Sequence, residues 1–158
     1  MASRSGSTPP KSVDKLIEAS PSPRSAKNHF LRLIEASAAD ALDRIPAAAQ
    51  PDLFRLLGGS AFLSDVLIRE GKDWPELFLR QTKIEQKSVA DHLKDLHEAI
   101  KDARSFDEFC AALRRHKQRE YLRIGARDLT PSVTMEDTVR ELTALAEASL
   151  EAAYRRSR

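Results

Sequence analysis

Hydrophobic residues recur every three or four positions along most of this chain, a spacing that places them on one side of an α-helix. No segment combines strict alternation of apolar and polar residues with a hairpin turn, so β-strands are not expected. The pattern predicts an all-α protein, a bundle of about six to seven antiparallel helices. Between positions 25 and 45, for example, the apolar positions are Phe30, Leu31, Ile34, Ala38, Ala41, Leu42 and Ile45.

Capping residues, prolines and glycines divide this pattern into separate helices. Gly58 and Gly59 are expected to end one of them with positive φ angles. Ser, Gly, Thr and Pro dominate the first ten residues, so we expect 1–25 to be a disordered tail with one short helix at most, followed by a helical domain over 26–158. The start and stop signals predict helices over 12–19, 25–44, 51–57, 60–69 and 105–129, with further helices beginning near 73, 88 and 134.

The last two predicted helices each have an apolar side that is expected to face the core. If it does, Leu142→Ala or Ile124→Ala should cost about 2–5 kcal/mol of stability, whereas Glu98→Ala should cost little. The expected core positions are Phe106, Phe109, Cys110, Leu113, Tyr121 and Ile124 in the first of these helices, and Val139, Leu142, Leu145, Ala146, Leu150 and Ala153 in the second.

Charge and cysteine content exclude several classes of protein. The 26 basic and 24 acidic residues leave a net charge of +2, which is too small to indicate a nucleic-acid or membrane partner. The single cysteine, Cys110, cannot form an internal disulfide, and the first residues lack the apolar run of a secretory signal. A cytoplasmic location is therefore expected. Charges interrupt every apolar run before it reaches the roughly 18 residues that span a bilayer.

The sequence offers no complete catalytic site. The four histidines are scattered, and none has the spacing to a second histidine or to Cys110 that a zinc site needs. His92 lies on an apolar stripe, which favours a core position. The Gly58-Gly59-Ser60 turn is not followed by an Asp-x-Asp pair, and no phosphate-binding loop is present. We expect no metal or cofactor to be bound by this chain.

The densest charge lies between residues 114 and 128, where six basic residues accompany two acidic ones. Such a run can bind a phosphate backbone or an acidic protein surface. It can equally be a solvated helix face with local pairs, because Glu120 is three residues from Arg123 and from Lys117. The residues alone leave both interpretations open.

Three stretches of the sequence, taken in order, resemble the opening of the bifunctional glutamine synthetase adenylyltransferase and adenylyl-removing enzymes. The most specific is the run Arg-Glu-Tyr-Leu-Arg-Ile-Gly-Ala-Arg-Asp-Leu at 119–129. The resemblance extends roughly from Leu53 to the C-terminus, and the three stretches are residues 53–69, 113–129 and 135–147.

The resemblance implies a role in nitrogen metabolism. Enzymes of this family are long, with two nucleotidyltransferase domains joined by helical regions. They attach AMP to glutamine synthetase or remove it, under control of the PII signalling protein, and they use ATP and magnesium. The helical opening precedes the first of those domains, and no catalytic residue of the family has a matching position here. The chain alone is expected to be inactive.

Two hypotheses follow. The first is that the chain is the N-terminal helical segment, or a fragment, of such an enzyme, and that it docks against the catalytic domain. The second is a self-standing helical module that binds a protein partner through its basic face. The candidate residues for an interdomain interface, chosen from charge density and the resemblance, are Arg119, Glu120, Arg123, Arg127 and Asp128.

Overall fold

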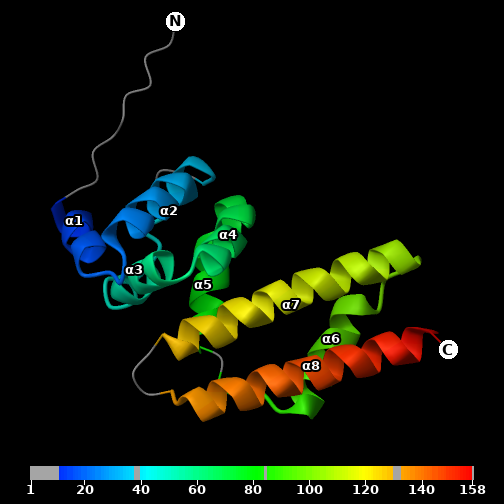
Figure 1. Ribbon diagram of the computed structural model, residues 1–158. Helices are drawn as coiled ribbons and strands as arrows, with labels where there is room; N and C mark the ends of the chain where they lie inside the picture. The colour runs from blue at the N-terminus through cyan, green and yellow to red at the C-terminus, as the bar shows by residue number, and fades with distance from the viewer. Residues whose placement is uncertain (1–10, 38–39, 84, 130–132, 158) are drawn as a thin grey trace, which may run out of the picture. The chain divides into compact units, whose positions relative to one another are not determined.

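The computed structural model describes residues 11–37, 40–83, 85–129 and 133–157. Within these ranges the chain forms eight α-helices, one 3₁₀ helix and no strand (Figure 1). The all-α prediction is confirmed, and the helices are slightly more numerous than expected. The sequence indicated one helical domain over 26–158, whereas the structure divides into two compact units, Met1–Lys72 and Asp73–Arg158.

The first unit is built from four helices, followed by the 3₁₀ helix η1 (Gly71–Asp73) at its boundary. In this unit α2 packs against α3 and α4, and α1 packs against α2 and α3. The rings of Phe30 and Phe54 join α2 to α3, with their centroids 5.1 Å apart. The four helices are α1 (Lys11–Glu18), α2 (Pro23–Glu35), α3 (Gln50–Gly59) and α4 (Ala61–Arg69).

Two expectations for the N-terminal part concern where its helices begin and end. α1 is the short helix expected within 1–25, but residues 1–10 lie outside the described residues, so a disordered tail stays a prediction. The helix expected over 25–44 is too long, because α2 ends at Glu35. Ala41 and Ile45 are nevertheless buried in the turns that follow, so their apolar spacing reflects burial rather than a continued helix.

The positive φ angles expected at Gly58 and Gly59 are wrong. Both glycines lie inside α3, and among the described glycines the positive φ belongs to Gly71, at 59°. Gly58 instead allows a close approach. A Cβ atom at this position would lie 3.0 Å from the Cβ of Ser20 and 3.2 Å from the backbone nitrogen of Ser22.

The second unit contains the two longest helices, which lie side by side and run antiparallel (Figure 1). α6 packs against both of them, and α5 packs against α7. Trp74, Leu77 and Phe78 of α5 are buried, as predicted. The helices of this unit are α5 (Trp74–Lys83), α6 (Val89–Ile100), α7 (Phe106–Asp128) and α8 (Met135–Ser157).

Three helices of the second unit begin at the predicted positions, where hydroxyl side chains cap their first turns. Ser88 and Asp91 form a reciprocal capping box at the start of α6. The Ser105 hydroxyl accepts a hydrogen bond from the backbone N–H of Glu108 at 3.1 Å, which caps α7. The Thr134 hydroxyl does the same for α8. Local capping chemistry therefore fixes where these helices begin.

The predicted core sides of α7 and α8 are partly wrong. In α7, Phe109 and Ile124 are buried, but Phe106 is 70% exposed. In α8, Leu145 is buried, whereas the other five expected core positions are exposed. The buried side of α8 instead consists mostly of small residues, which let neighbouring helices approach closely. It is formed by Glu141, Ala144, Leu145, Ala148, Ser149 and Ala152.

Candidate functional site

The five candidate interface residues all lie in the second half of α7, but the structure places them differently. Glu120 is 4% exposed and Arg123 is fully buried, so these two charges face into the unit. Arg127 is largely buried beside them. Asp128 is exposed and accepts a hydrogen bond from the Thr138 hydroxyl at 2.7 Å, and Arg119 is half-buried.

Arg123 lies at the centre of a buried cluster of charges. Its Nε atom donates to Glu120 Oε2 at 2.9 Å, and its Nη2 atom forms ion pairs with Glu120 and with Glu141 of α8. Its Nη1 atom donates to the backbone oxygen of Glu85 at 3.1 Å. One guanidinium thus connects α7, α8 and the segment that precedes α6, a use of several donors that arginine geometry favours.

Lys87 and Arg127 complete this cluster. The Lys87 ammonium lies 2.8 Å from Glu120 Oε1 and 2.8 Å from Asp95 Oδ2, and the Lys87 backbone N–H donates to Glu141 Oε1 at 2.8 Å. Arg127 Nη1 lies 2.8 Å from Glu141 Oε2. We call the following residues the buried charge cluster, in which Asp95 lies at the exposed edge: Lys87, Asp95, Glu120, Arg123, Arg127 and Glu141.

Burial and nearby charges shift the pKa values of two groups, Glu120 in the cluster and His92 beside it. Burial alone would raise the pKa of Glu120, but hydrogen bonds and positive charge from Lys87 and Arg123 outweigh it and hold the pKa below its usual value. Burial lowers the pKa of His92, whose Nδ1 lies 3.5 Å from Glu120 Oε2, and the charges of Arg123 and Lys87 lower it further against the pull of Glu120. Glu120 is therefore ionised and His92 neutral at pH 7.

The cluster suits an architectural role better than a chemical one. The carboxylates of Glu120 and Glu141 are each held by two cationic side chains, so neither is poised to accept a proton. Among the described residues, no group of three His, Cys, Asp or Glu side chains has an arrangement that would hold a metal ion. Sequence reasoning missed Lys87 and Glu141, because charged residues of a helical pattern are usually solvated.

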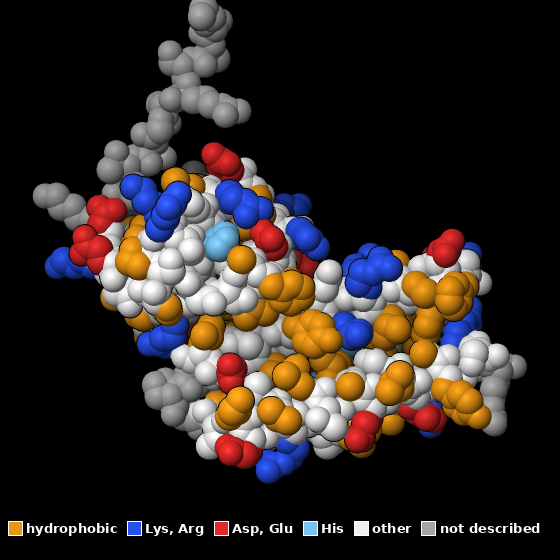
Figure 2. All heavy atoms as spheres, in the orientation of Figure 1, with side chains coloured by type: hydrophobic (Ala, Val, Ile, Leu, Met, Phe, Trp, Pro, Cys, Tyr) orange, Lys and Arg blue, Asp and Glu red, His pale blue; other side chains and the backbone are white. Residues whose placement is uncertain are grey.

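The second feature of this unit is a row of exposed apolar side chains on α8. Six exposed residues at helical spacing form what we call the outer stripe, four larger apolar side chains and two alanines. Figure 2 shows hydrophobic side chains on the surface of α8. Met135, Val139 and Leu150 are each more than half exposed. The outer stripe consists of Met135, Val139, Leu142, Ala146, Leu150 and Ala153.

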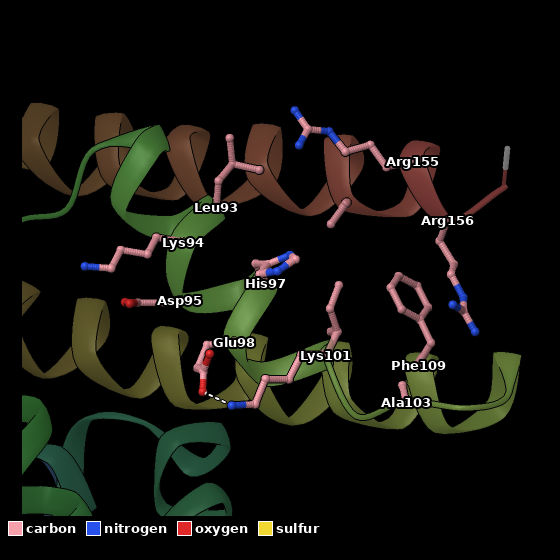
Figure 3. A pocket seen from close by; sticks show the side chains of 12 residues that line it. Leu93, Lys94, Asp95, His97, Glu98, Lys101, Ala103, Phe109, Arg155 and Arg156 are labelled. Atoms are coloured by element: carbon pink, nitrogen blue, oxygen red, sulfur yellow. Dashed lines mark hydrogen bonds and ion pairs between the residues drawn. The ribbon is translucent and has the colours of Figure 1, made fainter.

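A groove of about 820 Å³ lies beside α6, the start of α7 and the end of α8 (Figure 3). Leu93, Phe109 and Ala152 contribute apolar surface to it. Arg156 from α8 lies over the Phe109 ring of α7, 5.9 Å from its centroid. Lys101, which follows the end of α6 and lines the groove, pairs with Glu98 of that helix. The groove is mixed in charge, so it does not define a ligand by itself.

No helix in the described part of the chain is both long enough and apolar enough to cross a membrane.

The family model and the related proteins that match this chain point to the same family. The sequence model of the glutamate-ammonia ligase adenylyltransferase family matches residues 50–157. A bifunctional glutamine synthetase adenylyltransferase/adenylyl-removing enzyme from Shewanella woodyi is 32% identical over 97 residues, which is 61% of this chain and 10% of that protein. The enzyme of the same name from Pseudomonas aeruginosa is 29% identical over 120 residues, 76% of this chain and 12% of that protein.

A third protein of that name, from Nitrosococcus oceani, is 31% identical over 132 residues, which is 80% of this chain and 13% of that protein. No solved structure matches the chain significantly. The chain spans only about a tenth to an eighth of the length of these relatives. The matched region includes α3 to α8, and with them both the buried charge cluster and the outer stripe. The chain therefore belongs to the glutamate-ammonia ligase adenylyltransferase family.

Proposed function

We propose that this chain is the N-terminal helical segment of an enzyme that transfers AMP to and from glutamine synthetase. In this proposal its role is to pack against the catalytic part of the enzyme and to support the shape of that site. Reaction chemistry, with ATP and magnesium, belongs to the rest of the enzyme, as do contacts with glutamine synthetase and the PII protein. The family match and the small share of each relative that the chain spans support the proposal.

The outer stripe of α8 is the observation that carries this proposal. α8 turns small side chains such as Ala144 and Ala148 toward α6 and α7, and it leaves Met135, Leu142 and Leu150 toward solvent. A helix that served this unit alone would bury its largest apolar side chains, because each contributes about 1.5–3 kcal/mol when it is removed from water. An exposed row of such residues indicates a surface that another protein segment covers.

The buried charge cluster supports the same role. Arg123 and Arg127 of α7 hold Glu141, which lies between the outer-stripe residues Val139 and Leu142 along α8. The cluster therefore fixes the rotation of α8 about its own axis, and hence the direction in which the stripe points. We propose that Arg119 and Asp128 extend the interface with the catalytic part, whereas Glu120, Arg123 and Arg127 contribute to it by positioning α8.

The alternative is a self-standing module that binds a partner through the basic run at 114–128. Two of its six cations, Arg123 and Arg127, form ion pairs inside the unit, which weakens this alternative. The module would not require an exposed apolar stripe.

The native mass of the protein in its source cells tests the proposal. An antibody raised against residues 105–127 should detect a species several-fold heavier than 17.7 kDa, the mass of this chain. A species near 17.7 kDa alone would contradict the proposal and would direct the search toward a separate binding partner.

A further inference from the structure

The groove beside α6, the start of α7 and the end of α8 has a floor of aliphatic and aromatic side chains. Leu93 and Ile100 come from α6, Phe109 from α7 and Ala152 from α8, so three helices of the second unit build this apolar surface (Figure 3). Its volume of about 820 Å³ lies within the range of roughly 300–1,000 Å³ that small-molecule sites occupy. The groove can therefore cover the apolar body of a small ligand.

Charges of both signs line the groove, but most of them already have a partner of opposite sign. Three ion pairs account for both lining carboxylates and for two of the lining cations, and they join Asp95 to Lys87, Glu98 to Lys101 and Arg155 to Glu151. The other two lining cations, Lys94 and Arg156, have no carboxylate within ion-pair distance in the part of the chain that the structure describes. The charge left over at the groove is positive, which complements an anionic ligand.

Arg156 is the cation that is better placed to hold an anion beside the apolar floor. Its guanidinium carbon lies 5.9 Å from the centroid of the Phe109 ring, which itself lines the groove. In Figure 3, Lys94 lies at the other end of the groove and extends away from Phe109. A guanidinium that rests on an aromatic ring loses less freedom when it binds, and its planar donors match the two oxygens of a carboxylate.

From this arrangement we propose that the groove binds a small molecule that has an apolar body and a single carboxylate group. The apolar body lies against Leu93, Ile100 and Ala152, where it is removed from water. The carboxylate accepts hydrogen bonds from the guanidinium of Arg156. The apolar floor supplies most of the affinity, and Arg156 selects an anionic ligand over a neutral one of the same shape.

This site is separate from the surface that the proposed function uses. Among the described residues, none belongs both to the lining of the groove and to the outer stripe. The stripe is an exposed row along α8, whereas the groove also needs residues of α6 and α7. Failure of ligand binding therefore leaves the native-mass test unaffected, and the converse also holds.

Titration of the full 158-residue chain with 2-naphthoate, followed by NMR of the backbone amides, tests the site. The amide signals of Leu93, Ile100, Phe109 and Ala152 should shift and saturate, with a dissociation constant below about 1 mM. The neutral analogue 2-naphthamide has the same ring system and should bind about fivefold more weakly, because it forms no ion pair with Arg156. Absence of saturable shifts, or shifts centred on the outer stripe, would overturn the proposal.

Charge reversal at two exposed arginines of α8 then tests which cation holds the carboxylate. Arg156→Glu should weaken binding of 2-naphthoate at least about tenfold, because attraction becomes repulsion, and it should leave binding of 2-naphthamide unchanged. The matched control Arg140→Glu lies outside both the groove and the outer stripe and should bind 2-naphthoate as the unchanged chain does. Circular dichroism verifies that both variants are helical. Equal affinities of the two variants for 2-naphthoate would overturn the proposal.

Discussion

Gly58 and Gly59 are neighbours in α3, but Gly58 lies close to Ser20 and Ser22, whereas Gly59 is exposed. Gly58→Ala would place a methyl group 3.0 Å from Ser20 atoms and 3.2 Å from a backbone nitrogen, so we expect a loss of about 1–3 kcal/mol of unfolding free energy. Gly59→Ala is the control. Gly59 is exposed, so this change should be neutral or stabilising by up to ~1 kcal/mol. Urea unfolding of both variants checks this, and equal stabilities would contradict the close approach.

Arg123 should matter far more than an exposed arginine. Arg123→Met would leave Glu120 and Glu141 buried with less positive charge, so we expect a loss of roughly 3–5 kcal/mol of unfolding free energy. Arg155→Met breaks an exposed pair with Glu151 and should cost less than about 1 kcal/mol. If thermal unfolding gave similar losses for the two variants, the cluster would not be structural.

His92 should make the stability of the chain depend on pH. Its pKa is lowered in the folded protein, so as pH falls below about 6.5 the unfolded chain binds a proton that the folded chain resists. Stability present at pH 7 is therefore lost on acidification. His92→Leu should reduce this loss, although His116, whose pKa is also lowered by burial, keeps part of it.

Urea unfolding at pH 7.5, 6.5 and 5.5, a window chosen around the usual histidine pKa, measures the effect. His97→Leu, at an exposed position of the same helix, serves as the control and should retain the wild-type pH dependence. An unchanged loss of stability in His92→Leu would show that the histidine is not the cause.

At the scale of single elements, the exposed side of α8 revises the stability loss that the sequence predicted for Leu142→Ala. Leu142 is exposed, so Leu142→Ala should cost less than about 1 kcal/mol rather than the full cost of a core leucine. Leu145 is buried, and Leu145→Ala should cost about 2–5 kcal/mol. Chemical denaturation measures the loss of unfolding free energy in each variant. A larger loss for Leu142→Ala than for Leu145→Ala would mean that α8 turns its other side toward the core.

The sequence predicted most helix starts because capping is local. Ser60, Ser88, Ser105 and Thr134 act where their spacing to the next polar residues indicated. The core side of α8 was not predictable in this way, because this helix has apolar residues both on its buried side and on the exposed outer stripe. Periodicity shows that a helix has an apolar side, but it does not show which neighbour covers it.

The candidate site was located only in part from the sequence. The resemblance directed attention to a part of α7 in which Glu120, Arg123 and Arg127 join one charge cluster, and their role in an interdomain interface stays a prediction. Their partners Lys87 and Glu141 lie 33 and 14 positions away from Glu120 and Arg127 along the chain. Pairing over such separations depends on how the helices pack, which single-sequence patterns do not reveal.

At the scale of the whole molecule, the two units are stabilised by different interactions. The first unit is held by apolar packing such as that of Phe30 and Phe54, whereas the second adds the buried charge cluster and presents the outer stripe. The family match begins in α3 and includes the whole second unit. We therefore propose that the docking surface lies in the second unit, on α8.

Binding to the rest of a related enzyme tests this claim most directly. The binding partner in this experiment is the Pseudomonas aeruginosa relative from which the matching 12% of its length has been removed. Calorimetry measures how tightly this truncated protein binds the chain. We predict saturable one-to-one binding that Leu142→Ser/Leu150→Ser weakens at least about tenfold, or 1.4 kcal/mol, and that Arg140→Ser/Glu147→Ser leaves unchanged. Binding that is equally strong with the altered stripe, or no binding by the unchanged chain, would contradict the account.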